Sequence, residues 1–232
     1  MALPSINTSD FVGEIQLSQI SYQQNGLQLA IDEQYPRFVR AVIGDEAYNT
    51  VRNQDPLEQK WVDLFNETYY FNTEQDKNLL HSGLRFCARY VIYYHYLSDY
   101  AQVASPVGKV RNNNENSTNI NAAPYANSRF NKAVRVLLEE VYPFIKNYEK
   151  LSVDIASSVE VAGTYTLGVS DTTYLVNGDT VTINGTEYTV SNVVANTSFD
   201  ITTTTGLDFT GDTATYEPYK DFPLHHFFPN LF

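Results

Sequence analysis

The stretch TYLVNGDTVTINGTEYTVSNVVANTSFDITTTT (residues 173–205) decides the fold class of this chain of 232 residues. It is rich in Thr and Val, and its turn signals NGD, NGT and AN are typical of connections between paired strands. We expect roughly five to seven short antiparallel strands over about residues 157–217, forming a small sandwich or barrel. The aromatic residues of this region are spaced like core residues of strands: Tyr165, Tyr174, Tyr188, Phe199, Phe209 and Tyr216.

Before Leu151 the apolar residues recur every three to four positions, which indicates helices. We expect a helix from Tyr22 with a kink at Pro36, and Gly44 as a left-handed C-terminal cap. A capping-box spacing at DPLE (residues 55–58) favours another helix start. The further expected helices cover about residues 45–53, 55–71, 74–101 and 124–151.

The change of period therefore predicts an α+β protein, with a bundle of about four to five helices followed by an antiparallel β domain. Extended arms are expected at both ends, and a long polar loop separates the last two helices. The expected segments are an N-terminal arm (1–20), a helical bundle (21–152, with the loop at 103–122), a β domain (153–218) and a C-terminal arm (219–232).

Charge and composition exclude several classes of function. The net charge is −12, and the residues from Val153 onward contain ten acidic and one basic side chain, so general attraction for nucleic acid is not expected. The single cysteine, Cys87, lies in an apolar helical stretch and is expected to be a buried, inert thiol. The sequence has no secretion signal pattern and no membrane-spanning run, which favours synthesis in a reducing cytoplasm.

No catalytic constellation is evident. The sequence has no glycine-rich phosphate loop and no nucleophile elbow, and carboxylate pairs drawn from 27 acidic residues carry little information. His81 and His95 are expected on one long helix about 21 Å apart, too far to share a metal. His225 and His226 have no evident partner ligands. We therefore expect no catalytic residues, no metal and no cofactor.

Three quoted stretches of the helical half carry a resemblance. They are FVRAVIGDEAYNTVR (38–52), LLHSGLRFCARYVIYYHYLSDY (79–100) running into ASPVGKVRNNNENS (104–117), and VRVLLEEVYPFIKN (134–147). Over about residues 20–152 the chain resembles the head-to-tail connector proteins of tailed bacteriophages, also called adaptor, head-completion or neck-ring proteins, of a short-tailed phage and with the crAss-like group as one candidate. The matching positions are Gly44, Tyr48, Tyr93 to Tyr100, Pro106 to Val110, and Glu115 with Asn116.

This resemblance implies a structural virion protein that forms a ring, typically of about twelve copies, below the portal protein. Such a ring connects the capsid to the next neck ring or tail protein and continues the channel for double-stranded DNA, without sequence specificity and without a membrane. The loop implied to contact a neighbouring subunit or to face the channel contains Pro106, Val107, Gly108, Lys109, Val110, Arg111, Glu115 and Asn116. Lys109 and Arg111 are also compatible with a solvated loop.

The C-terminal residues DFPLHHFFPNLF (221–232) raise a question of their own, because soluble chains seldom end on exposed Phe and Leu. Two alternatives stay open: an arm that docks on the portal or a neighbouring subunit, or a segment that folds back onto its own bundle. The anchors are Phe222, Leu224, Phe227, Phe228, Leu231 and Phe232. Two other functions also stay open, a tail or baseplate module whose β domain contacts glycan or a receptor, and, less favoured, a hydrolase.

Overall fold

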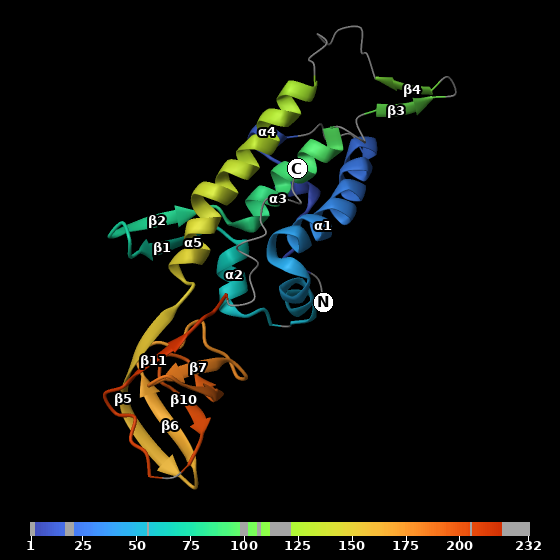
Figure 1. The fold of residues 1–232 in the computed structure, drawn as a ribbon. Coiled ribbons are helices and arrows are strands. Elements are labelled where there is room, and N and C mark those ends of the chain that lie inside the picture. The colour runs from blue at the N-terminus through green and yellow to red at the C-terminus, as the bar shows by residue number, and fades with distance from the viewer. Residues whose placement is uncertain are drawn as a thin grey trace. The chain divides into compact units, whose positions relative to one another are not determined.

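A computed structural model describes residues 3–16, 21–54, 56–97, 102–105, 108–111, 122–204 and 206–219. It has an α+β fold that separates into two compact units (Figure 1). The helical unit contains the described residues up to Leu57 together with Trp61–Phe144. The barrel unit contains Glu58–Lys60 and residues 145–219.

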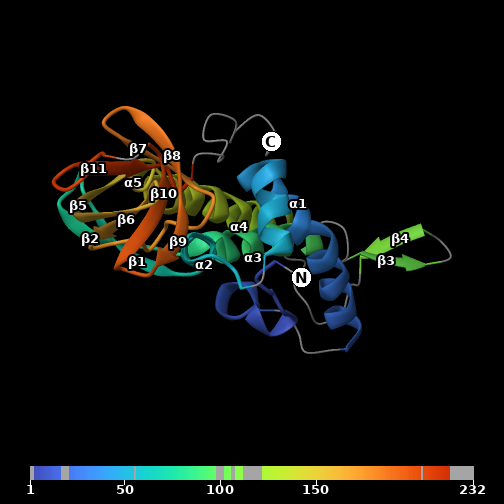
Figure 2. The same cartoon turned by 90° about the horizontal axis from the view of Figure 1, so that it is seen from below.

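Three helices form the centre of the helical unit. The middle helix α3 (Gly83–His95) contacts both α1 (Ser21–Asn53) and α4 (Ala122–Val136), and the three lie side by side (Figures 1 and 2). Helix α1 continues through Pro36, where a kink was predicted, and its non-helical residue is Gly44 (φ 81°, ψ 169°). A glycine tolerates this conformation because it has no Cβ, so the predicted break at Gly44 is confirmed.

The helices predicted over about 55–71 and 74–101 are wrong in part. Only α2 (Gln59–Phe65) and α3 are helical there, and between them β1 (Thr68–Asn72) pairs with β2 (Lys77–His81) as an antiparallel hairpin. The apolar residues of 68–81 are consecutive (69–71 and 79–80), so they distinguish neither a period of two nor one of 3.6, and burial of one face of the hairpin decides between them. His81 and His95 consequently lie on different elements.

Two further expectations need correction. The last helix was predicted to run to about Leu151, but α4 is followed by the π-helical segment η4 (Leu137–Val141) and α5 (Tyr142–Asn147), and a strand begins at Leu151. The π-helical segment precedes Pro143, which lacks the backbone N–H that a regular helix requires. Within the predicted loop 103–122, β3 (Gln102–Ser105) pairs with β4 (Gly108–Arg111).

The barrel unit is a seven-stranded antiparallel sheet with the strand order β8-β7-β11-β5-β6-β10-β9. Strands β8 and β10 also contact each other, so the sheet nearly closes on itself, and the predicted small antiparallel β domain is confirmed. Its strands are β5 (Leu151–Val161), β6 (Thr164–Val169), β7 (Thr180–Ile183), β8 (Thr186–Thr189), β9 (Ser191–Val194), β10 (Ser198–Thr202) and β11 (Thr213–Tyr216).

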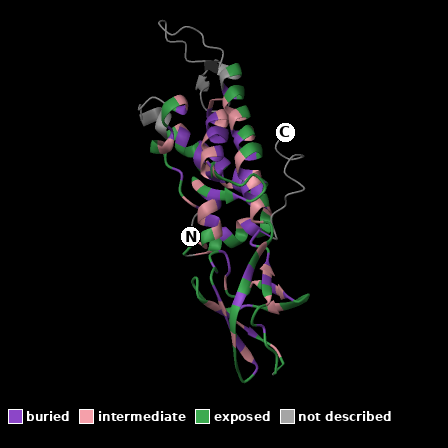
Figure 3. Ribbon diagram, turned by 90° about the vertical axis from the view of Figure 1, so that its left-hand side faces the viewer, coloured by how far each residue is buried: buried purple, intermediate pink, exposed green. Residues whose placement is uncertain are grey.

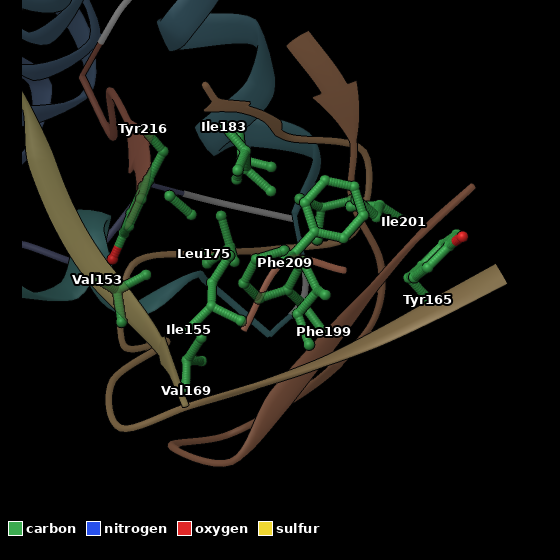
Figure 4. Close-up of a cluster of buried hydrophobic side chains, with 14 of the residues drawn as sticks. Val153, Ile155, Tyr165, Val169, Leu175, Ile183, Phe199, Ile201, Phe209 and Tyr216 are labelled. Atoms are coloured by element: carbon green, nitrogen blue, oxygen red, sulfur yellow. The ribbon is translucent and has the colours of Figure 1, made fainter. Parts of the chain in front are cut away.

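Each unit has its own hydrophobic core. In the barrel, side chains from β5, β6, β7, β10 and β11 converge on a cluster that includes Ile155, Leu175 and Phe199 (Figure 4). In the helical unit, Leu84, Cys87, Val91 and Ile92 of α3 are buried, and Figure 3 shows buried residues along the helices and strands of both units. Across the described ranges, no helix has both the length and the apolar character needed to cross a bilayer.

Candidate interaction surfaces

The hairpin β1–β2 presents an exposed apolar surface. Tyr69, Phe71 and Leu80 project from the same side of the two strands, because Tyr69 is paired with Leu80 and Phe71 lies two residues from Tyr69. Their exposed fractions are 74%, 49% and 38%. We call this surface the hairpin face. Contiguous exposed aromatic and aliphatic side chains of this kind are typical of contact surfaces between proteins.

The opposite side of the same hairpin is buried. Tyr70 meets Phe144 edge-on with ring centroids 5.2 Å apart, and the His81 ring stacks on Phe144 at 4.0 Å. Asn72 is also buried, and its side-chain oxygen accepts a hydrogen bond from the Gln75 backbone at 2.8 Å within the turn. The hairpin face is therefore held in a fixed orientation by an apolar anchor on its other side.

His81 is a structural residue of this anchor. Its Nε2 lies 2.9 Å from the backbone oxygen of Asp63, and its Nδ1 accepts a hydrogen bond from the Gly83 N–H at 3.2 Å. An imidazole that accepts at one nitrogen and donates at the other is neutral. Burial lowers the pKa of His81 from 6.5 to about 4, although the Asp63 carbonyl opposes the shift. Next to it, Ser82 donates to a Glu140 carboxylate oxygen from its backbone N–H (3.0 Å) and hydroxyl (2.6 Å).

The lowered pKa of His81 makes the stability of the helical unit depend on pH. Between pH 6.5 and about 4 the unfolded chain binds a proton at His81 and the folded chain does not, so the helical unit loses stability as the pH falls through this window. We expect a loss of about 2.5 kcal/mol from this residue between pH 7 and pH 4.5. Urea unfolding followed by the fluorescence of Trp61, the only tryptophan, measures it. His81→Gln keeps a donor and an acceptor without titrating in this range, and an equally steep pH dependence in this variant would contradict the assignment.

The second candidate surface lies where the N-terminal residues meet α3 and α4. Residues 3–16, called here the N-terminal arm, include the 3-10 turns η1 (Thr8–Asp10) and η2 (Gly13–Ile15). The Glu14 carboxylate accepts hydrogen bonds from Lys132, Arg129 and the Tyr90 hydroxyl, the last at 2.6 Å. The hydrogen bond from Lys132, followed by that from Tyr90, holds the pKa of Glu14 below its ordinary value.

Asp10 extends the same charged contact along α3. Its carboxylate lies 3.6 Å from Arg85, and its backbone oxygen accepts a hydrogen bond from Arg89 at 3.1 Å. Two carboxylates of the arm therefore face four cationic side chains, which are Arg85, Arg89, Arg129 and Lys132. The basic side of this contact is not neutralised by the arm alone.

The predicted loop residues are only partly described. Gly108, Lys109, Val110 and Arg111 form β4, and Gly108 and Arg111 are paired with Ser105 and Gln102 of β3. This segment is therefore a paired strand rather than the polar loop expected from its composition. Outside the described residues lie Pro106, Val107, Glu115 and Asn116.

All the predicted anchors of the C-terminal arm also fall outside the described residues: Phe222, Leu224, Phe227, Phe228, Leu231 and Phe232, as do His225 and His226. In the barrel, the prediction that the aromatic residues are core residues is confirmed. Tyr165, Tyr174, Phe199, Phe209 and Tyr216 are buried, and Tyr188 packs against them partly buried. These rings serve the barrel's own core, so they do not form a glycan-stacking platform.

Among the described residues there is neither a metal-ligand cluster nor a reactive thiol. Among those residues, no three His, Cys, Asp or Glu side chains gather in a way that would hold a metal ion. Cys87 is a free thiol that is completely buried, and burial raises its pKa far above the ordinary value. The thiolate is the reactive form of cysteine, so this thiol is inert, as the sequence predicted.

Comparisons with known proteins give no match, whether to a protein family, to a curated protein or to a solved structure. Sequence reasoning missed both surfaces described above. For the hairpin face a signal was available, since residues 68–71 (TYYF) all favour strands and are followed by a polar turn. For Glu14 there was none, because its partners Arg129 and Lys132 are more than a hundred residues away.

Proposed function

We propose that this chain is a structural virion protein that forms an oligomeric ring below the portal of a tailed bacteriophage. The ring connects the capsid to the next neck ring or tail protein and continues the DNA channel through which the genome is ejected. It performs no catalysis and requires no cofactor. The proposal places the protein in the neck of the virion after synthesis in the bacterial cytoplasm, with a ring of about twelve copies.

The hairpin face is the observation that carries this proposal. Tyr69, Phe71 and Leu80 are exposed, yet their strands are anchored from behind by Tyr70 and His81. A ring of identical subunits needs a surface patch on one copy that fits a different patch on the next, and rigid aromatic side chains suit such a contact.

Two properties of composition and one of sequence support the same function. The high aromatic content of 14% suits extensive contact between subunits. The net charge of −12 favours a channel along which DNA slides instead of adhering. The resemblance of residues 20–152 to connector proteins points to the same class. The buried aromatic residues of the barrel weaken the alternative of a glycan-binding module.

Replacing Tyr69 and Phe71 together by threonine is expected to dissociate the ring while leaving the helical unit folded. Threonine keeps a high preference for strands, so the change removes contact area without disfavouring the hairpin. Covering both rings is worth about 3 kcal/mol, so the association constant should fall about a hundredfold. Size-exclusion chromatography with light scattering, and negative-stain imaging with and without portal protein, measure the assembly.

A matched control is available on β5. Val159 and Val161 are also exposed, also two residues apart on a strand, and also paired in a hairpin. The Val159→Thr and Val161→Thr double variant should assemble like the unchanged protein. If the Tyr69/Phe71 variant keeps the full ring mass, the hairpin face is not part of the subunit interface. An unchanged protein that stays monomeric even with portal protein would refute the proposed function itself.

A further inference from the structure

The N-terminal arm is packed on the helical unit in the manner of a bound peptide. Its backbone hydrogen bonds are local, from Asp10 N to Asn7 O (3.0 Å) and from Gln16 N to Gly13 O (3.1 Å) among others. The Asn7 N–H also donates to the Asp10 carboxylate at 2.9 Å. The arm therefore keeps its own turns, and its shape does not depend on strand pairing with the rest of the chain.

Apolar side chains and single polar contacts attach the arm to the helices. Leu3, Ile6, Phe11 and Ile15 are buried at intervals along it. The hydroxyl of Tyr35, on α1, donates to the Pro4 carbonyl at 2.6 Å. Alternating anchors of this kind are how extended and short helical peptides occupy grooves on a partner protein.

The charges of the arm and its groove are complementary. Asp10 and Glu14 belong to the arm, and Arg85, Arg89, Arg129 and Lys132 belong to α3 and α4. A cavity of about 660 Å³ opens beside Glu14 along α4 and is lined mainly by polar side chains, including Asn127, Ser128 and Asn131.

We propose that the arm is exchangeable, and that in the assembled ring the arm of each copy occupies the groove of the next copy. The exchanged and unexchanged forms make the same contacts, so exchange costs little and turns an internal contact into a subunit interface. This inference rests on the proposed ring, whose contacts must join two different surfaces, and the arm and its groove are such a pair.

Charge reversal in two separate chains tests the exchange. Glu14→Arg sets an arginine against Arg129 and Lys132, and Arg129→Glu sets a glutamate against Glu14. Each variant alone should lose at least nine-tenths of its ring fraction. The two variants are then expressed together with different affinity tags. The arm of the Glu14→Arg chain meets opposite charge in the groove of the Arg129→Glu chain, and the unchanged arm of the second chain fits the unchanged groove of the first. The mixed protein should then recover the ring mass of the unchanged chain, with both tags in one particle.

The outcomes separate the inference from the proposed function. A mixture as defective as its components, while a single chain carrying both substitutions forms rings, means that the arm stays on its own chain and the inference is wrong. Single variants that assemble normally also overturn it. If the unchanged protein forms no ring even with portal protein, the proposed function fails, and the inference fails with it.

A cross-link gives a second measurement, which reports which chains are joined covalently instead of the ring mass. Glu14→Cys and Lys132→Cys in one chain place two thiols at a direct contact, and the native Cys87 is buried and unreactive. Treatment of assembled protein with a short bis-maleimide should give a ladder of covalent multimers on a denaturing gel if arms are exchanged. A cross-linked monomer as the sole product would overturn the inference.

Discussion

Gly83→Ala is expected to destabilise the helical unit by at least about 3 kcal/mol, combining a left-handed backbone with a steric clash. Gly83 has a φ of 76°, and an added Cβ would lie 2.5 Å from the Asn66 backbone oxygen and 2.6 Å from that of Phe65. These are backbone atoms, which cannot rotate away as a side chain does. A loss of this size is a large share of the 5–15 kcal/mol that typically stabilises a domain, roughly a fifth to more than half of it.

The comparison with Gly13→Ala isolates the clash. Gly13 belongs to the same unit and also has a positive φ, 63°, but no described atom lies within 4 Å of its Cβ position. This control should cost only about 1 kcal/mol. Urea unfolding monitored through Trp61 fluorescence compares the two variants, since Trp61 is in the helical unit. Equal losses would show that α3 does not begin in close contact with residues 65 and 66.

Tyr165→Ala is expected to cost the barrel about 4 kcal/mol or more through the cavity alone. Tyr165 is fully buried on β6, and its ring meets Phe209 edge-on at 5.2 Å. Its hydroxyl donates to the Thr204 carbonyl at 3.1 Å and accepts from the Leu207 N–H at 2.9 Å. The side chain therefore fills the core, and its hydroxyl also holds the backbone at Thr204 and Leu207, which precede β11.

Tyr165→Phe separates these two roles. It keeps the ring but leaves the backbone groups of Thr204 and Leu207 without the hydroxyl, which should cost about 1–3 kcal/mol. Tyr188→Phe is the matched control, because Tyr188 is only partly buried and should lose less than about 0.5 kcal/mol. Amide hydrogen exchange of β6 and β10 measures the barrel, and Trp61 fluorescence tells whether the loss stays within it. If Tyr165→Phe leaves the stability of the barrel unchanged, water replaces the two hydrogen bonds of the hydroxyl.

Residues 68–81 show why part of the helical unit escaped prediction. Leu79 fits a helical stripe in the sequence, and the capping-box spacing at residues 55–58 favoured a helix over about residues 55–71. In the fold, Tyr70 and His81 are buried against Phe144, which lies more than sixty residues later in the chain. The energy of that contact is available only in the strand pairing, because in a continuous helix residues eleven positions apart would lie about 16 Å apart along the axis, too far to meet one ring.

The charged contact of the N-terminal arm escaped prediction for a related reason. Residues 1–20 have a weak pattern and were expected to form an extended arm. Glu14 acquires its role only because α3 and α4 place Tyr90, Arg129 and Lys132 beside it. A carboxylate carries no sign in the sequence of which distant cation will pair with it.

The sequence by itself determined the small antiparallel β domain, the Asn-Gly turn at residues 184 and 185, and the break at Gly44. At the turn between β7 and β8, Asn184 and Gly185 have φ values of 50° and 79°, the left-handed conformation that Asn-Gly favours in a two-residue hairpin. These features depend on the conformational preferences of adjacent residues and on a regular period. Only the tertiary structure decided that residues 68–81 form a hairpin with an exposed aromatic face, and that Glu14 meets the cations of α4. Those outcomes depend on burial and charge pairing between residues far apart in the chain, whose partners are fixed only when the helices pack.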